Sequence, residues 1–284
     1  MSAPHGLTKT LPPTFTDDDI VQIGKLLYGW TGMIFGPNKR YYIERRVTDR
    51  MARLELREPK IYIDFASHNL AEREALINAF TINETYFYRE DHQLAALSRQ
   101  ILPEIVRHKQ PGDLVRIWSM PCSTGEECYS IAIWLLENWP LVDAYNIEIV
   151  GSDVDTAALG LAAAGLFSSR SLTRLPDAVL ERYFEPEKDH RRKIIDDLRE
   201  SVRFTAANIV DHSSLSGLGQ FDVILCRNLL IYFDDRSRLI AADNMHACLV
   251  EGGYLCLGHS ESMSRISNRF TLARLEDAIV YRRA

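Results

Sequence analysis

The sequence lacks the features that would place its 284 residues in a membrane-bound or nucleic-acid-binding class. No apolar run approaches the ~18 residues that a membrane-spanning helix needs, and the N-terminal stretch MSAPHGLTKTLPPTF has no apolar signal core. We predict that residues 1–14 form a frayed arm. The net charge of −6 provides no overall basic field for nucleic acid. We therefore expect a cytoplasmic protein with neither direct membrane insertion nor a nucleic-acid partner.

Cysteine and histidine are present without the spacings that bind metals. The five cysteines are an odd number and include no CxxC pair, which favours reduced thiols in a cytosolic protein. They are Cys122, Cys128, Cys226, Cys248 and Cys256. The eight histidines show no HExxH or similar ligand spacing, so we predict no metal site.

Glycine is scarce in the stretch 117–136, IWSMPCSTGEECYSIAIWLL, which organises the chain. A short apolar run, a turn of small residues and an amphipathic helix from Glu126 form a strand–loop–helix unit, the usual opening of a nucleotide-binding α/β domain. Because Gly125 is the only glycine of the loop, the GxGxxG pattern of an NAD oxidoreductase is absent. Glu126 and Glu127 would suit a cationic ligand or ligand hydroxyls, or they only complement the helix dipole.

The chain before residue 81 has the pattern of a small helical region. Thr16 and the acids after it predict a helix start, and further helices are expected over 38–57, 62–70 and 71–80. On the helix over 38–57, a basic stripe lies beside an apolar one. The basic stripe comprises Lys39, Arg46, Arg50, Arg53 and Arg57. Like charges four residues apart repel by a few tenths of a kcal/mol, so the stripe either binds an anionic partner or is a solvated face.

From residue 114 the pattern alternates between strand and helix. Strands are expected over 115–120, 147–151, 202–205, 221–226 and 253–257, with two more within 270–282. Helices are expected over 94–108, 126–139, 157–166 and 236–249. This alternation predicts an α/β domain with a mostly parallel sheet, in which one of the last two strands is antiparallel. The rhythm breaks in the charged segment 168–201, where we predict an inserted subdomain with a small hairpin sheet.

Polar residues follow the predicted strands at the edge where such sheets bind ligands. Asp153 follows the second strand, a position from which a carboxylate can accept hydrogen bonds from ribose hydroxyls, although Asp also ends strands for turn reasons. Arg227, Asn228 and Tyr232 follow FDVILC, the most apolar strand. A buried strand that delivers these three residues favours a functional role over a structural one.

Several motifs together resemble the CheR-type chemotaxis receptor methyltransferases, which are protein-glutamate O-methyltransferases that use S-adenosylmethionine. They are TINETYFYRE at 81–90, STGEECYSIA at 123–132, SDVD at 152–155, CRNLLIYF at 226–233 and GHSES at 258–262. The resemblance runs from about Phe15 to the C-terminus. It implies a small all-helical N-terminal domain at 15–90 with a linker to about 112. It also implies a Rossmann-like methyltransferase domain at 113–284 with a β-subdomain inserted at about 168–203.

The resemblance also implies the site residues. Cofactor contacts fall on Asn83, Thr85, Arg89, Glu126, Asp153, Asn208, Ile209, Arg227 and Asn228. Arg89 and Tyr232 are nearest the reacting methyl, and the basic stripe is expected to bind the helical, glutamate-bearing cytoplasmic region of chemoreceptors. The acceptor glutamate is ionised near neutral pH because its reference pKa is about 4.3, so no general base is needed. The products are a glutamate methyl ester and S-adenosylhomocysteine.

Chemistry suggests what several of these residues do. Asp153 should accept hydrogen bonds from the ribose hydroxyls, Glu126 can face the cationic methionyl end, and Asn208 and Ile209 should frame the adenine. In the family, some members dock through the inserted subdomain onto a receptor's C-terminal peptide. The segment EPEKDHRRKIIDDL has no glycine and looks shorter than the corresponding turn of those members, so we expect an enzyme that acts without a tether. We also expect a monomer.

Three other functions would be compatible with parts of the sequence. A serine hydrolase built on GHSES is excluded because Ser262 stands where the elbow needs glycine and no histidine follows His259. A non-catalytic S-adenosylmethionine-binding scaffold could lose Arg89 or Tyr232, but both are present. A methyltransferase that acts on another protein or on a small molecule remains open.

Overall fold

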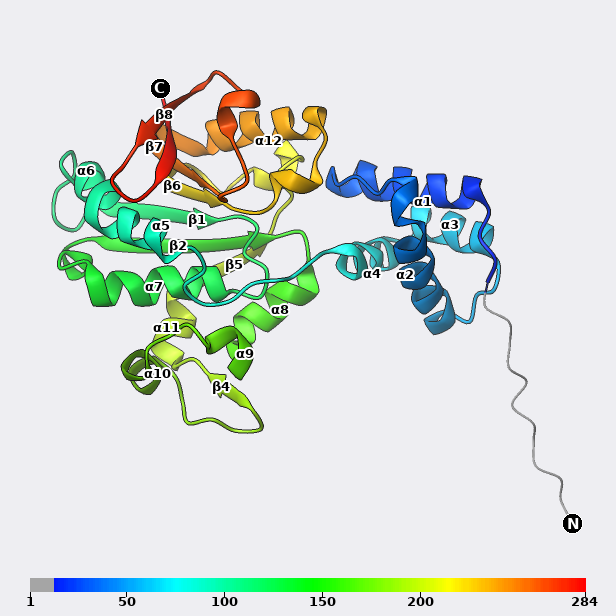
Figure 1. Ribbon diagram of the computed structural model, residues 1–284, viewed down its shortest axis with the longest axis horizontal. Coiled ribbons are helices and arrows are strands. Elements are labelled where there is room, and N and C mark those ends of the chain that lie inside the picture. The colour runs from blue at the N-terminus through cyan, green and yellow to red at the C-terminus, as the bar shows by residue number, and fades with distance from the viewer. Residues whose placement is uncertain (1–12) are drawn as a thin grey trace, which may run out of the picture. The chain divides into compact units, whose positions relative to one another are not determined.

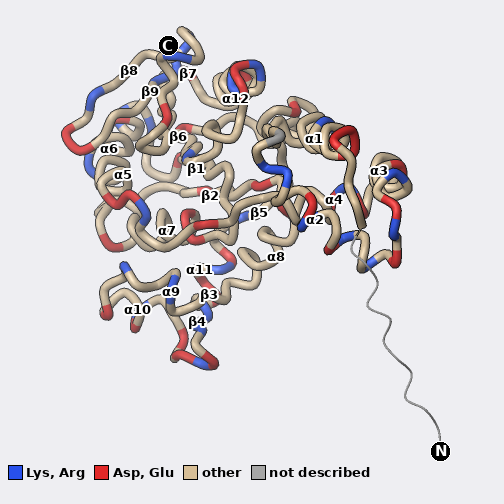
Figure 2. The backbone as a smooth tube through the Cα atoms, turned by 45° about the vertical axis from the view of Figure 1, so that its right-hand side comes forward, with Lys and Arg blue, Asp and Glu red and all other residues tan. Residues whose placement is uncertain are grey.

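The computed structural model describes residues 13–284, so that most of the predicted N-terminal arm lies outside the described residues. The chain divides into two compact units, of which the first ends at Phe80 and the second spans Thr81–Ala284 (Figure 1). Lys and Arg alternate with Asp and Glu over both units (Figure 2). No helix within residues 13–284 is long and apolar enough to cross a membrane.

The first unit is a bundle of helices around one apolar core. Its elements are α1 (Asp17–Thr31), the 3-10 helix η1 (Pro37–Lys39), α2 (Arg40–Arg53), α3 (Pro59–His68) and α4 (Leu70–Phe80). A capping box between Thr16 and Asp19 starts α1, and Gly32 ends it with φ 74°. Each of the four α-helices contributes apolar side chains to the core, for example Leu27, Val47 and Leu76.

The predicted bounds of the helix over 38–57 were wrong at both ends. The structure begins α2 at Arg40 and ends it at Arg53, because Glu55 has a left-handed backbone with φ 57° and Pro59 starts the next helix. Lys39 therefore lies in η1, and Arg57 lies beyond the helix end. The basic stripe is not a single helical face.

The second unit is built on a seven-stranded sheet in the order β5-β2-β1-β6-β7-β9-β8. The strands are β1 (Leu114–Ser119), β2 (Asn146–Asp153), β5 (Val202–Ala206), β6 (Phe221–Cys226), β7 (Leu249–Leu257), β8 (Phe270–Arg274) and β9 (Ile279–Arg283). Strands β5, β2, β1, β6 and β7 run parallel, whereas β9 pairs antiparallel with both of its neighbours. At the centre, Ile117 pairs with Ile149 on one side and with Val223 on the other. The predicted α/β sheet with one antiparallel strand near the C-terminus is confirmed.

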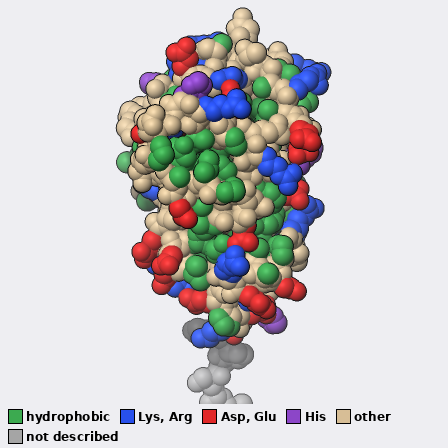
Figure 3. Space-filling view, turned by 90° about the vertical axis from the view of Figure 1, so that its left-hand side faces the viewer, with side chains coloured by type: hydrophobic (Ala, Val, Ile, Leu, Met, Phe, Trp, Pro, Cys, Tyr) green, Lys and Arg blue, Asp and Glu red, His purple; other side chains and the backbone are tan. Residues whose placement is uncertain are grey.

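Helices cover the sheet as the alternation predicted. They are α7 (Glu126–Asn138), α8 (Thr156–Ala164) and α12 (Asp235–Cys248), with the short 3-10 helices η3 (Val142–Ala144), η4 (His212–Leu215), η5 (Leu230–Tyr232) and η6 (Met263–Arg265). Figure 1 shows α7 and α8 on one side of the strands and α12 on the other. On the face drawn in Figure 3, exposed hydrophobic side chains form a group that is surrounded by charged side chains.

The segment 81–112 belongs to the second unit and does not form a linker. It carries α5 (Asp91–Ala96), the π-helical turn η2 (Leu97–Ile101) and α6 (Leu102–Val106). Phe87, Leu94 and Ile101 are buried in the core of this unit. The expected boundary at residue 90 and the linker to about 112 are thus replaced by a division after Phe80, because the apolar side chains of this segment pack on the sheet unit.

The charged segment after α8 forms the inserted subdomain. It contains β3 (Leu166–Ser168), α9 (Ser169–Leu172), α10 (Asp177–Tyr183), β4 (Arg191–Lys193) and α11 (Asp196–Ser201). β3 pairs antiparallel with β4, and Lys188 forms a further bridge to Arg191. Asp189 and His190 have φ 51° and 59°, which is the backbone of a tight two-residue hairpin turn.

Candidate functional site

The carboxyl ends of the parallel strands bring the predicted polar residues to one edge of the sheet. The β1–α7 loop follows Ser119, and Asp153 ends β2. Asn208 lies two residues beyond β5, and Arg227 follows β6 directly. Because these strands are parallel, their ends meet at the same edge, which is where sheets of this kind bind ligands.

The β1–α7 loop depends on its single glycine. Gly125 has φ 94°, and a Cβ there would lie 2.9 Å from the Cβ of Ala162, so a side chain would be strained and would clash. Directly after it, Glu126 is buried at the start of α7. Its carboxylate accepts a hydrogen bond from Thr124 Oγ1 at 2.6 Å, and burial raises the pKa of Glu126.

Asp153 is buried at this edge, with 4% of its surface exposed. Its two oxygens accept backbone N–H groups from Ser123 at 2.8 Å and from Asp155 at 2.9 Å. Burial outweighs these bonds and raises the pKa of Asp153 to about 6. A carboxylate has about four lone-pair sites, so Asp153 can still accept a hydroxyl donor.

Asp155 is a site residue that sequence reasoning missed. Its carboxylate caps α8 through the N–H of Ala158. It also accepts hydrogen bonds from Asn83 Nδ2 at 2.7 Å and from Thr81 Oγ1, while Ser123 Oγ donates to Asn83 Oδ1 at 3.1 Å. These bonds fix the irregular segment 81–83 to the residues that follow β1 and β2. The available signal was an Asp directly before a helix, which is the preferred N-cap residue.

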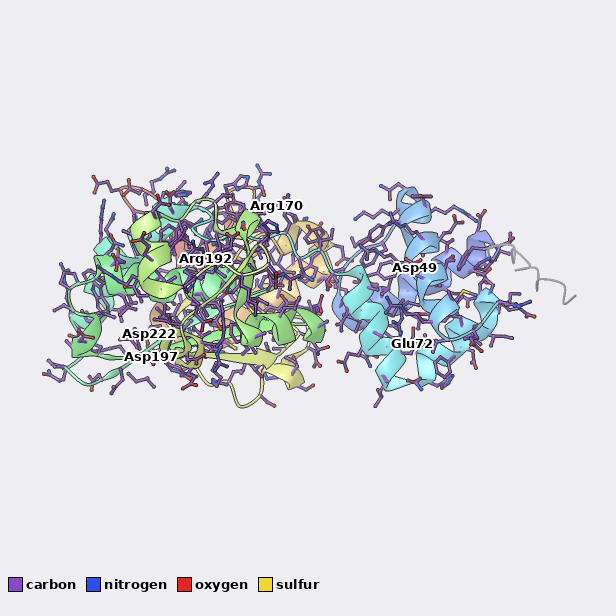
Figure 4. The ribbon with its side chains drawn as sticks, turned by 90° about the horizontal axis from the view of Figure 1, so that it is seen from below. Asp49, Glu72, Arg170, Arg192, Asp197 and Asp222 are labelled. Atoms are coloured by element: carbon purple, nitrogen blue, oxygen red, sulfur yellow. The ribbon has the colours of Figure 1, made fainter. Side chains whose placement is uncertain are left out.

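A cavity of about 740 Å³ lies next to this segment. Its lining includes Asn83, Thr85, Tyr86, Glu126, Arg170 and Arg174. Three of these residues were predicted as cofactor contacts, and the two arginines come from the insert (Arg170 is labelled in Figure 4). The ring of Tyr86 has the guanidinium of Arg89 at 5.7 Å and that of Arg174 at 5.0 Å from its centroid, which is within the range of cation–π attraction.

The residues that follow β6 form hydrogen bonds with other residues of the same chain. Arg227 is buried, and its guanidinium donates to Glu127 Oε2 and, at 2.7 Å, to the carbonyl of Arg89. Asn228 has a left-handed backbone with φ 59°, and its N–H donates to Glu261 at 2.7 Å. Arg227 thus contacts protein groups where a direct cofactor contact was expected.

Glu261, which was also missed, organises this turn. Besides Asn228, it accepts the N–H groups of Leu230 at 2.7 Å and Gly258 at 2.9 Å. Burial raises the pKa of Glu261. Tyr232 is half-buried in η5, directly beyond this turn.

The two residues expected at the adenine lie after β5. The amide oxygen of Asn208 accepts the N–H of Val210 at 3.2 Å, whereas Ile209 is buried and its carbonyl accepts a hydrogen bond from Asn244 at 2.7 Å. The Ile209 side chain is therefore part of the core that packs beneath this edge of the sheet.

In the helical unit, the residues of the basic stripe differ in their surroundings. Arg50 forms an ion pair with Glu72 at 2.6 Å, and Glu72 is only 3% exposed (Glu72 is labelled in Figure 4). The hydroxyl of Tyr62 donates to the same carboxylate at 2.7 Å. By contrast, Arg53 and Arg57 are exposed. Arg50 therefore has a structural partner inside the chain.

The site suits a ligand that brings hydroxyl donors and a positive centre. Within residues 13–284, neither Asp153 nor Glu126 forms an ion pair with a basic side chain, although both are buried. Buried carboxylates of this kind are stabilised by a cationic or hydrogen-donating ligand. The described residues contain no cluster of His, Cys, Asp and Glu that could hold a metal ion.

Comparison with known proteins identifies the class. A family model described as "CheR methyltransferase, SAM binding domain" matches residues 83–279, and one described as "CheR methyltransferase, all-alpha domain" matches residues 18–81. The protein is a methyltransferase with an S-adenosylmethionine-binding domain. It belongs to the CheR methyltransferase family.

Its relatives bear chemotaxis names. The chain is 46% identical to "Chemotaxis protein methyltransferase 2" of Vibrio cholerae over 268 residues, which cover 94% of this chain and 93% of the relative. It is 30% identical to "Chemotaxis protein methyltransferase 1" of Pseudomonas aeruginosa, over 88% and 92% of the two chains. Among solved structures, N-methyltransferase NodS from Bradyrhizobium japonicum with S-adenosyl-L-homocysteine covers 75% of this chain and 96% of its own, at 17% identity and a TM-score of 0.37.

Proposed function

We propose that this protein transfers a methyl group from S-adenosylmethionine to glutamate side chains on the cytoplasmic helices of chemoreceptors. The observation that carries the proposal is membership of the CheR family over both domains, together with relatives named chemotaxis protein methyltransferases. The resulting glutamate methyl esters would serve sensory adaptation in chemotaxis.

The residues at the strand edge suit this chemistry. The cofactor, when bound, supplies an electrophilic methyl on a sulfonium. Asp153 would accept hydrogen bonds from the ribose hydroxyls, Glu126 would face the cationic methionyl end, and Asn208 with Ile209 would frame the adenine. Asn83 and Thr85 line the cavity beside Glu126 and would close this side of the cofactor.

Arg89 and Tyr232 are the residues we assign to the reacting centre. The acceptor carboxylate is already ionised near neutral pH, so catalysis comes from positioning it and removing water around it. Arg89 would steer the carboxylate. A tight ion pair would also make the carboxylate a poorer nucleophile, so we expect steering to outweigh activation.

The first test is the reaction itself. Purified protein and labelled S-adenosylmethionine should methylate receptor cytoplasmic fragments and give base-labile methyl esters. Fragments in which the acceptor glutamates are replaced by alanine are the control and should take up no label. Methylation of a different protein from the same cells, with none on the receptor, would support the rival reading of a methyltransferase with another substrate.

Receptor binding is proposed to use the exposed part of the basic stripe. Arg53 and Arg57 are exposed, and each exposed ion pair with a receptor glutamate is worth roughly 0.2–1 kcal/mol. Lys39 and Arg46 are half-buried against aromatic rings and can extend the surface. Arg50 forms an ion pair with Glu72. It would therefore add only long-range positive potential to this surface and would not bind a receptor glutamate directly.

Charge reversal tests this surface. Arg53→Glu with Arg57→Glu should raise the KM for receptor and leave cofactor affinity unchanged. It should also remove most of the salt dependence of the wild-type rate, since screening acts within about 10 Å at 0.1 M salt. Lys60→Glu, at an exposed position on the same unit, is the matched control. Unchanged receptor kinetics in the double variant would contradict the assignment.

We also propose that the enzyme needs no receptor tether. The support is the hairpin of the insert, in which only Asp189 and His190 form the turn between Lys188 and Arg191. A receptor that lacks its C-terminal tail should be methylated at the same rate as the intact receptor. Tight binding of a tail peptide to the enzyme, measured by calorimetry, would be the opposite result.

A further inference from the structure

Arg89 lies between two residues whose backbone is left-handed. Tyr88 and Glu90, on either side of it, both have φ 56°. A left-handed backbone at a residue other than glycine is uncommon, and it persists only where the surroundings enforce it. The structure must therefore supply contacts that fix this turn.

A buried charge network supplies those contacts. Arg227, whose side chain is 4% exposed, donates Nη1 to the carbonyl of Arg89 at 2.7 Å, and the same atom lies 3.7 Å from Glu90 Oε2. Its Nε donates to Glu127. Glu127 is held in turn by Ser119 Oγ at 2.7 Å. The network thus links the turn at Arg89 to the end of β1, the start of α7 and the end of β6.

Glu90 is fixed from a second direction. Gln93 Nε2 donates to Glu90 Oε2 at 2.7 Å and to the carbonyl of Leu257 at 2.8 Å, while His259 Nδ1 lies 2.9 Å from Glu90 Oε1. The Glu90 and Glu127 side chains are each 11% exposed, whereas His259 is 71% exposed. Gln93 of α5, His259 after β7 and Arg227 after β6 therefore all contact the residue that follows Arg89.

We infer that Glu90, Glu127 and Arg227 are positioning residues for Arg89. None of the three lines the cavity beside Glu126. Arg227 donates a hydrogen bond to the Arg89 carbonyl, and Glu127 accepts one from Arg227. Glu90 adds a second negative charge beside Arg227, and its own bonds to Gln93 and His259 fix the residue that follows Arg89. This inference rests on the proposed function only in that Arg89 acts at the reacting centre.

The experiment combines Glu90→Gln and Glu127→Gln with Arg89→Ala. Each amide is close in size to the carboxylate it replaces but removes the charge that holds Arg227. In wild-type background, each substitution should lower kcat by up to about 10²-fold, the cost of a misplacement of the order of 1 Å. The KM for receptor should change far less. Asp243→Asn, at the exposed ion pair with Arg269, is the matched control and should leave kcat unchanged.

The decisive measurement is non-additivity. If the network acts through Arg89, then adding Glu90→Gln or Glu127→Gln to Arg89→Ala should lower the residual kcat by no more than about twofold. A purely structural role would instead multiply the two losses, and this result would overturn the inference. Thermal unfolding of each variant shows whether a loss reflects misfolding.

A second readout does not depend on the receptor. Hydrogen exchange in the peptide spanning 84–93 should speed up in both amide variants, while exchange in α2 stays as in the wild type. Unchanged exchange at 84–93 would overturn the inference. If the wild-type protein methylates no receptor fragment, the proposed function fails, and the exchange result still decides whether the network holds this turn.

Discussion

Replacing Asp153 by asparagine should separate cofactor binding from folding stability. The carboxylate is buried at the end of β2, and the pKa of Asp153 is about 6 against an ordinary value of 3.8. This shift corresponds to roughly 3 kcal/mol of unfavourable free energy when the group is ionised at neutral pH. An amide removes that penalty. However, it has one acceptor oxygen for two backbone donors, those of Ser123 and Asp155.

The two effects on stability oppose each other. Leaving one buried N–H group without a partner costs about 1–3 kcal/mol, which offsets most of the gain. The free energy of unfolding of Asp153→Asn at pH 7.5 should therefore equal or slightly exceed that of the wild type. Cofactor affinity should fall by about ten- to a hundredfold, because a hydrogen bond to a charged acceptor is worth about 1.5–3 kcal/mol.

The same shift predicts a pH dependence. A raised pKa means that the folded protein binds this proton more tightly than the unfolded chain, so the contribution of Asp153 to stability rises as pH falls from about 6 towards 3.8. Cofactor binding has the opposite sign, because a protonated carboxyl accepts hydroxyl donors poorly. Affinity for S-adenosylhomocysteine should fall about tenfold between pH 7 and pH 5.

Isothermal titration calorimetry at several pH values, with chemical denaturation in parallel, measures both quantities. Asp143→Asn is the control, since Asp143 is exposed in η3. The reasoning is refuted if the folded Asp153→Asn variant binds as tightly as the wild type. It is also refuted if wild-type affinity is the same at pH 5 and pH 7.

Other substitutions test the remaining assignments. Arg89→Ala and Tyr232→Phe should lower kcat more than they weaken cofactor binding, as single-turnover rates and calorimetry can compare; equal losses in both would make them only binding residues. Arg50→Ala should cost about 3–5 kcal/mol of stability in urea denaturation, because it leaves the buried carboxylate of Glu72 without its ion pair. Arg53→Ala, on the same helix but exposed, should stay within about 0.5 kcal/mol of the wild type, and a similar loss in both variants would argue against the Arg50 assignment.

The fold followed from local patterns to a large extent. The apolar strand 221–226, the helix from Glu126 and the strand ended by Asp153 all lie where the sequence predicted them. These patterns work because a strand buried on both faces needs a continuous apolar run, and an amphipathic helix needs apolar residues at its own period. Since parallel strands end at one edge, the sequence also located that edge as the place for the site.

The limits of the helical unit were harder to predict. The apolar stripe on α2 is real, since Ile43, Val47 and Met51 are buried. Periodicity could not reveal that the backbone turns left-handed at Glu55. Likewise, the segment 81–112 contains helices in either interpretation, and only its packing assigns Leu94 and Ile101 to the core of the sheet unit.

What the sequence by itself determined is therefore the order of the elements, the sheet edge and the family motifs that lie along it. What only the tertiary structure decided is which charges meet. Arg227 bonds to Glu127, which lies 100 residues away in the sequence. Asn83 bonds to Asp155 over 72 residues. Arg50 bonds to Glu72 over 22 residues. The physical reason is that periodicity reports only whether a side chain faces the core or solvent. An ion pair depends on where two distant backbones are brought together by the packing of everything between them.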